Sequence, residues 1–255
     1  MMWIVLLSQK PAVEPIGVKD STVKDVYDKG EIDWTHGCIR AKGYGFIDPN
    51  KPKGQAKLLA ERAAVVDARR NLLEIVKGVH ITSETVVEDY MVSSDIVVQR
   101  VEGLVKDAKV IGKPKYYEDG RVEVWVEMKL DNLAKTLPTK PSVSEPQEKP
   151  EEGGVIIKTP EGTKACMYPR ILDENGNVLF DASQYPEAKD MWSKAIKYVK
   201  GKVSTLPGGS MVIEASETKG CDIIVKKEDL DKVSKLKKWG SYILKAGKLI
   251  INLVM

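Results

Sequence analysis

Residues 54–78 constrain the fold more than any other stretch, because they predict one long helix. Asp48 or Asn50 can cap its start, Pro52 suits a first turn, and Gly78 favours the end of the helix. Small and apolar residues form two stripes along it at three- and four-residue spacing. The first stripe consists of Ala64, Ala68, Leu72 and Ile75, and the second of Leu59, Ala63, Val66 and Leu73. One stripe is enough to cover a small sheet. The second is therefore either ordinary core or a contact with another element, in this chain or in a second copy.

The segments around this helix predict strands. Residues 31–46 favour a strand pair with a turn near His36-Gly37 and a bend at Gly43 and Gly45, and the β-branched residues 79–92 favour another strand. A short helix follows at 96–105, and then a hairpin over 106–130 whose tight turn is Asp119-Gly120. Apolar and polar residues alternate along its second strand. Trp125 lies on the polar side, so we expect it to cover the short helix or to contact another copy.

The clearest boundary in the chain is residues 137–154, which hold four prolines and almost no large apolar residue. Such a composition is typical of a semi-extended linker. It separates an N-terminal arm (1–30) and a first domain (31–136) from a second domain (155–255). In the second domain the sequence predicts an Asn175-Gly176 hairpin, a helix from Pro186 to Val199, a helix near 226–238, and buried strands that include 248–254. The expected fold class is α+β, with two small domains that each consist of a mostly antiparallel sheet packed with helices.

The sequence contains no convincing catalytic, metal-binding or nucleotide-binding motif. The 40 basic and 37 acidic residues are interspersed and leave a net charge of +3, which does not predict a nucleic-acid partner. The two histidines, His36 and His80, do not combine with Cys38 into a zinc-ligand spacing. Gly208-Gly209-Ser210 lacks the frame of a nucleophile elbow, and Gly43-x-Gly45 lacks the third glycine of a nucleotide-binding loop. The sequence therefore predicts no catalytic residue, no metal, no cofactor and no enzymatic activity.

The cysteines and the N-terminal residues give information about the cellular compartment of the protein. Cys38, Cys166 and Cys221 stand far apart and in odd number, so we expect three separate, partly buried thiols, while a bridge between copies stays open. Residues 1–7 form an apolar run that is too short to span a bilayer. This run is either the tail of an export signal, cleaved near Ser8 or Gln9, or a short strand or adhesive tail. The run is not followed by a lipobox cysteine, so direct lipid attachment is not predicted.

The first domain resembles a known family in four pieces: the Gly43-x-Gly45 bend, AERAAVVDARRNLLEIVKGV, SSDIVVQRVEGLVKDAKV and YYEDGRVEVWVEMKL. Residues 43–130 resemble the LPP20 lipoprotein family, which includes the flagellar assembly lipoprotein P, and are similar to the N-terminal domain of flagellar assembly protein T. The second domain, with ACMYPRILDENGNVLF and CDIIVKKEDLDKV, resembles the C-terminal extension of longer members. The resemblance implies an envelope protein, in the periplasm, at the outer membrane or on the extracellular surface, with no known enzymatic activity. Some members form rings or disks around the flagellar motor.

These observations together predict an exported structural protein that assembles with copies of itself into a ring, disk, tube or filament, with other envelope or flagellar proteins as further partners. Both apolar ends, 1–7 and 248–254, are predicted to exchange strands with a neighbour, because an unpaired edge is a natural docking site. The candidate contact residues are Leu59, Ala63, Val66, Leu73, Trp125, Trp3, Ile4, Val5, Ile250 and Ile251. The alternative is a monomeric periplasmic module that binds a glycan or a partner protein between its domains.

Overall fold

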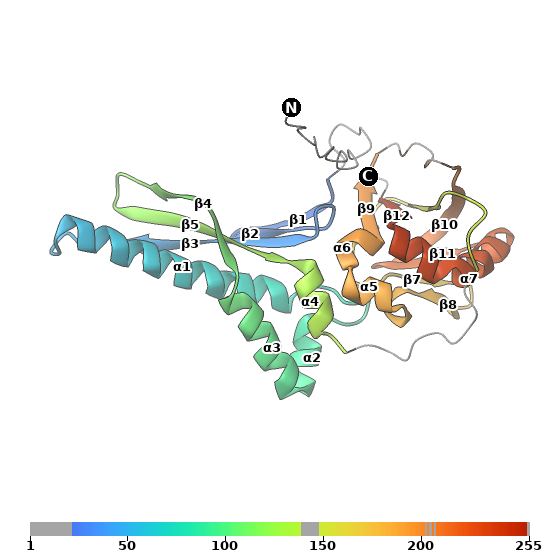
Figure 1. Cartoon of the computed structure of the whole chain (residues 1–255), viewed down its shortest axis with the longest axis horizontal. Helices are drawn as coiled ribbons and strands as arrows, with labels where there is room; N and C mark the ends of the chain where they lie inside the picture. The colour runs from blue at the N-terminus through green and yellow to red at the C-terminus, as the bar shows by residue number, and fades with distance from the viewer. Residues whose placement is uncertain (1–21, 139–147, 202, 204–205, 207, 254–255) are drawn as a thin grey trace, which may run out of the picture.

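The computed structural model describes residues 22–138, 148–201, 203, 206 and 208–253. Within these residues the chain forms helices and two sheets, so the expected α+β class is confirmed (Figure 1). The strands of the first sheet and the helices that pack with it come from the chain before the proline-rich segment, and those of the second come from the chain after it.

The first sheet contains five strands among the described residues, in the order β1-β2-β3-β5-β4, and all its neighbours are antiparallel. The strands are β1 (Lys24–Tyr27), β2 (Gly30–Asp33), β3 (Cys38–Phe46), β4 (Lys109–Tyr116) and β5 (Arg121–Lys129). The predicted turns at His36-Gly37 and Asp119-Gly120 are confirmed. Positive φ angles at Gly37 and Gly120 explain why glycine suits both.

Helix α1 (Lys53–Lys77) crosses one face of this sheet along β3 and β5. Gly43 and Gly45 do not bend β3; they let α1 approach its backbone. A Cβ on Gly43 would lie 2.0 Å from the Ala68 nitrogen, and one on Gly45 would lie 2.0 Å from the Ala60 oxygen. The buried stripe of α1 is made of small residues for the same reason. The helix begins after Pro52 without a side-chain cap, so the predicted caps at Asp48 and Asn50 are wrong.

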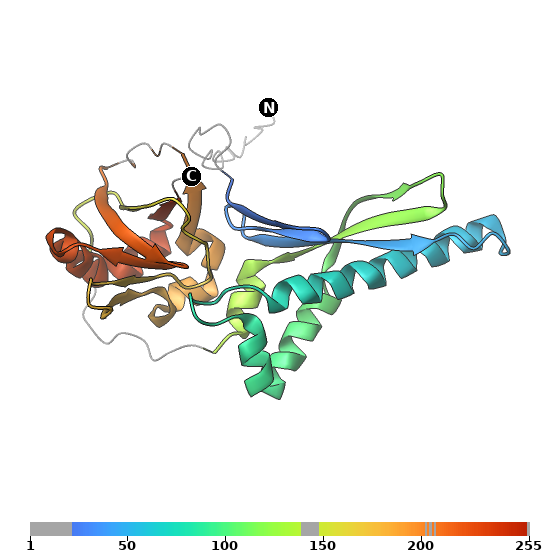
Figure 2. The ribbon, with the colours of Figure 1, turned by 180° about the vertical axis from the view of Figure 1, so that it is seen from behind.

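After α1 the chain turns back through two helices, α2 (Val87–Ser93) and α3 (Asp95–Lys106), and the first part ends with α4 (Leu130–Thr136). The strand predicted over 79–92 is wrong: His80 and Val86 form only an isolated bridge, and 87–93 are helical. Val87 and Met91 both face the core from α2. The free energy gained by burying them outweighs the β-propensity of this valine-rich segment. Figure 2 shows α2 and α3 standing beside the C-terminal half of α1, while its N-terminal half extends beyond them.

The second sheet contains seven strands among the described residues, in the order β8-β7-β11-β10-β6-β12-β9. They are β6 (Val155–Thr159), β7 (Arg170–Leu172), β8 (Val178–Asp181), β9 (Ile196–Lys200), β10 (Met211–Lys219), β11 (Asp222–Val225) and β12 (Leu249–Leu253). Four of the six pairings between these strands are parallel. The expectation of a mostly antiparallel sheet is therefore wrong for this half. Parallel strands are buried on both faces, which explains the continuous apolar runs of β6 and β12.

The second sheet carries short helical turns η1 (Ala182–Gln184), α5 (Pro186–Asp190), α6 (Trp192–Ala195) and η2 (Lys227–Asp229), and a longer helix α7 (Leu230–Ala246). The single helix predicted from Pro186 to Val199 is wrong, because residues 196–200 form the edge strand β9. Helix α7 runs further than predicted and ends at Gly247, which adopts the left-handed conformation at φ 68°.

The two sheets share one continuous core within the described part of the chain. At the junction the ring of Trp34 lies 5.9 Å from that of Trp192 and 6.0 Å from that of Tyr198. Backbone bonds also cross it: the Met167 and Tyr168 nitrogens donate to the His80 and Ile81 oxygens, each at 2.9 Å. The junction is therefore packed like a protein interior. Helix α1 projects from it together with β3, β4 and β5 (Figure 1). We call this projection the arm; it is not the N-terminal segment 1–30.

Candidate functional site

The outer face of the arm, opposite the sheet, is the first candidate surface. On the N-terminal half of α1 the side chains of Leu59 and Val66 are 40% and 61% exposed, and Ala63 between them is exposed as well. The second apolar stripe predicted from the sequence is therefore left uncovered by the described chain over this half. Leu73, about two turns beyond Val66, is instead half-buried against the core. The second stripe is thus packed against the core at its C-terminal end and exposed to solvent on the arm.

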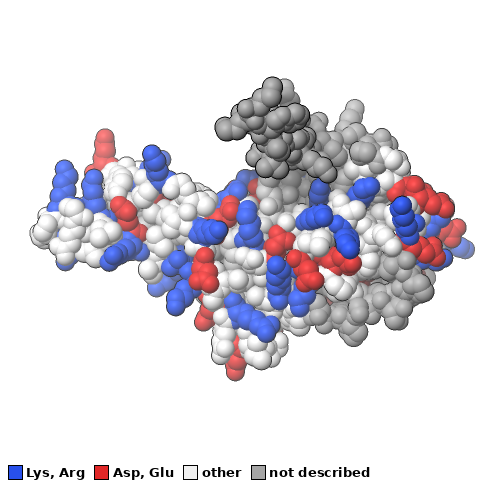
Figure 3. Space-filling view, viewed as in Figure 1, with Lys and Arg blue, Asp and Glu red and all other residues white. Residues whose placement is uncertain are grey.

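Beside this face, α1 and the edge strand β4 enclose an apolar groove of about 380 Å³. Its apolar lining residues are Leu58, Val65, Val66, Val110, Pro114 and Val124, and Glu61, Arg62 and Arg69 stand among them. The side chains of Leu58 and Val110 are 49% and 48% exposed. Large exposed aliphatic side chains gathered in one groove are unusual on a protein surface and mark contact sites. In Figure 3 the charges of the arm stand apart, with uncharged surface between them.

The opposite, open face of the arm carries Trp125. Its indole nitrogen donates to a Glu123 carboxylate oxygen at 3.0 Å, and the Tyr117 hydroxyl donates to the other oxygen at 3.0 Å. Burial by itself would raise the pKa of Glu123, but the hydrogen bonds from Trp125, Tyr117 and Tyr44 outweigh it and lower that pKa. Arg121 lies over the Tyr44 and Tyr117 rings. Trp125 is thus half-buried in an internally bonded aromatic cluster on the open sheet face.

The remaining predicted contact residues lie elsewhere. Ile250 and Ile251 are buried in β12, which pairs with β6 on one side and β9 on the other. The prediction that this run offers an unpaired edge is therefore wrong, because a central parallel strand has both edges bonded. Trp3, Ile4 and Val5 lie outside the described residues.

A disulfide that the sequence did not predict joins Cys166 to Cys221. The expectation of three separate thiols is wrong for this pair; Cys38 alone stays a free and fully buried thiol. Burial raises the pKa of the Cys38 thiol to about 11. Odd number and wide spacing misled the sequence argument, since the two bonded cysteines lie 55 positions apart and meet only through the tertiary fold.

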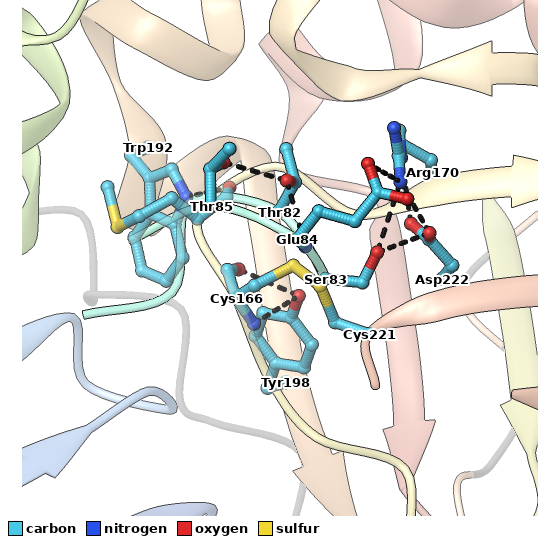
Figure 4. The surroundings of a disulfide bond; sticks show 11 residues. Thr82, Ser83, Glu84, Thr85, Cys166, Arg170, Trp192, Tyr198, Cys221 and Asp222 are labelled. Carbon is cyan, nitrogen blue, oxygen red and sulfur yellow. Dashed lines mark hydrogen bonds and ion pairs between the residues drawn. A yellow bond between two sulfur atoms is a disulfide. The ribbon is translucent and has the colours of Figure 1, made fainter. Parts of the chain in front are cut away.

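The disulfide lies where the second half meets the loop after α1 (Figure 4). Next to it, Arg170 binds Asp222 through its Nε at 2.8 Å and through a terminal nitrogen at 2.5 Å. Ser83, from the first half, donates to Asp222 and accepts from Arg170 at 3.0 Å. Tyr198 bonds both backbone groups of Cys166. The hydrogen bonds of Ser83 thus join the two halves, and the side chains of Ser83, Arg170 and Asp222 satisfy one another.

His36, considered above as a metal ligand, is mostly exposed in its turn and hydrogen-bonds Asp33 through Nδ1 at 2.9 Å. Across the described ranges, no group of three or more His, Cys, Asp or Glu side chains is placed to hold a metal ion. In the same part of the chain, no helix has the length and apolar character needed to cross a membrane.

Comparison with known proteins adds no assignment. No model of a known protein family matches the chain, and no curated protein matches it either.

Proposed function

We propose that this protein is an exported, non-enzymatic structural protein of the cell envelope that assembles with copies of itself through its arm. The observation that carries the proposal is the uncovered outer face of α1, where Leu59, Ala63 and Val66 face solvent on an element that projects from the rest of the fold. A helix with apolar residues on its free side is incompletely buried in the monomer. A second copy supplies the missing contact without a further gene product.

A second copy suits this face geometrically. Two α1 helices packed antiparallel about a two-fold axis near Arg62 and Ala63 place Leu59 of each copy opposite Val66 of the other. Ala63 lies at the centre, where its small side chain lets the two helix backbones approach. Fully burying a valine or leucine side chain is worth about 1.5–3 kcal/mol, so each of these half-exposed residues contributes about 1 kcal/mol. The reciprocal arrangement doubles each contribution.

Export is supported by the Cys166–Cys221 disulfide, since disulfides persist in oxidising compartments and are rare in the reducing cytosol. Assignment to the LPP20 family stays a proposal. It is supported by the way the quoted pieces work together: the alanine-rich segment is α1, the glycine pair admits it to β3, and the hairpin completes the sheet beneath it.

The test is size-exclusion chromatography with light scattering over a range of micromolar concentrations, followed by electron microscopy of any large species. We expect the unaltered protein to form oligomers, and the double variant Ala63→Asp, Val66→Glu to be monomeric with an unchanged circular dichroism spectrum. Burial of an unpaired carboxylate at the contact disfavours association strongly.

The control is Val92→Glu, which makes the same valine-to-glutamate change at a residue of α2 that is 85% exposed and lies outside the arm. This variant should assemble like the unaltered protein. If the unaltered protein stays monomeric throughout the range, the assembly proposal fails and the monomeric binding module becomes the better hypothesis. If the double variant assembles normally, the outer face of α1 is not the contact.

A further inference from the structure

The groove between α1 and β4 is built to receive an extended apolar segment. Its walls are aliphatic from both elements, with Leu58, Val65 and Val66 on the helix side and Val110 and Pro114 on the strand side. The groove has a volume of about 380 Å³. The wall formed by β4 is an edge strand of the sheet, so one side of its backbone is open to a partner.

One polar group in the groove points to an occupant. The Nε of Arg69 is buried, and no acceptor among the described residues binds it. The bond that Arg69 does make, from a terminal nitrogen to the Ala108 oxygen, is long at 3.5 Å. A buried donor without an acceptor is costly, and a backbone carbonyl of an inserted segment relieves that cost after a small shift of the side chain.

The chain itself contains a suitable occupant outside the described residues. Residues 1–7, MMWIVLL, are entirely apolar, whereas the rest of the N-terminal segment up to residue 21 is mixed and polar. The intervening residues 8–21 span up to about 3.5 Å each when extended, or roughly 50 Å in all. Residues 8–21 thus form a tether of up to roughly 50 Å between the apolar run and the first sheet.

We propose that the apolar residues 1–7 of one copy insert into the α1–β4 groove of the next copy, with Trp3 as the anchoring side chain. This contact rests on the proposed self-assembly and gives it a direction. Because the inserting segment and the groove are different surfaces, the contact is heterologous and propagates from copy to copy into a ring or filament. The outer face of α1 and the groove then serve as two neighbouring contacts, which share Val66.

The test is disulfide trapping between two singly substituted full-length chains. Trp3→Cys protein is mixed with Leu58→Cys protein that carries a tag, so that the heterodimer has its own mobility in a non-reducing gel. Cys38 does not compete in this experiment, because it is fully buried, and Cys166 and Cys221 are already bonded. The matched control replaces the tagged partner with tagged Val92→Cys, whose thiol is exposed on α2 away from the groove.

We expect a covalent heterodimer with Leu58→Cys that is absent with Val92→Cys and disappears on adding reductant. A double variant Trp3→Cys, Leu58→Cys that forms only an intrachain bond, without any heterodimer in the mixed sample, would overturn the proposal in favour of insertion within one molecule. Equal trapping of both partners would overturn it as non-specific adhesion.

Two further outcomes separate this inference from the proposed function. If light scattering shows oligomers but no heterodimer is trapped, the insertion is refuted while self-assembly stands. If the intact mass of the exported protein shows that the chain begins after Ser8, the inserting segment is lost in the mature form and the inference fails by itself.

Discussion

Reducing the Cys166–Cys221 disulfide should destabilise the protein strongly. The bond closes a loop with a sequence separation of 55 residues, and in the chain-entropy account such a loop is worth about 4 kcal/mol at 25 °C. The loop contains β7, β8, β9 and β10 with the helical turns between them. Opening it therefore frees much of the second sheet in the unfolded chain.

The assay is urea unfolding followed by tryptophan fluorescence, to which Trp34 and Trp192 at the junction of the two halves contribute. With a urea dependence of about 2–3 kcal/mol per molar for a chain of this size, a loss of about 4 kcal/mol lowers the midpoint by roughly 1.3–2 M. The comparison is between oxidised protein and the same protein in reductant, so that no side-chain volume changes.

The control is the double variant Cys166→Ala, Cys221→Ala, whose midpoint should be low and should not respond to reductant. An unchanged midpoint of the unaltered protein, under conditions where titration finds three free thiols, would refute the reasoning. In that case the loop ends would already be held together in the unfolded chain.

Three further predictions follow from individual contacts. Gly43→Ala should cost at least 1–3 kcal/mol in urea unfolding because its methyl group meets the α1 backbone, whereas Gly54→Ala, with open space around it, should stabilise by about 0.5–1 kcal/mol; equal effects would contradict the close approach. Iodoacetamide should label no thiol in the native protein and one, Cys38, after unfolding without reductant, because that thiol is buried with its pKa raised to about 11. Burial would raise the pKa of Asp229, but hydrogen bonds that its carboxylate accepts from Lys232 and from a backbone N–H outweigh burial and lower that pKa below 3.8. The stabilising effect of the Asp229 carboxylate is therefore present above pH 3.8 and is lost on acidification. Asp229→Asn should flatten the acid side of the plot of stability against pH, and an unchanged plot would contradict this.

Much of the first half follows from local patterns. The spacing of Ala64, Ala68 and Leu72 predicts α1 correctly, since periodicity over 25 residues is a strong signal. Asp119-Gly120 predicts its hairpin for an equally local reason, because few residues accept the backbone angles of such a turn. The bend that the sequence predicts at Gly43 and Gly45 is wrong. Their real role depends on a helix that crosses the strand from elsewhere in the sequence.

The candidate surface was predictable only in part. A second apolar stripe on α1 is visible in the sequence, but whether Val66 or Leu73 is exposed depends on where α2 and α3 stop covering the helix. No local pattern predicts the groove with β4, because it joins residues that lie far apart in the sequence, such as Leu58 and Pro114. The alternation along the 106–130 hairpin predicts that β4 pairs with β5. It does not predict that α1 lies beside β4.

Local sequence patterns predict the α+β class, the long helix with its two apolar stripes, and the hairpin turns, since each depends on residues within a few turns or one strand pair of each other. They do not predict the parallel order of the second sheet, the Cys166–Cys221 bond or the shared core around Trp34 and Trp192. The physical reason is that these contacts join segments far apart in the chain. Burial and close packing determine which distant segments contact one another, and a local sequence pattern does not predict those pairs.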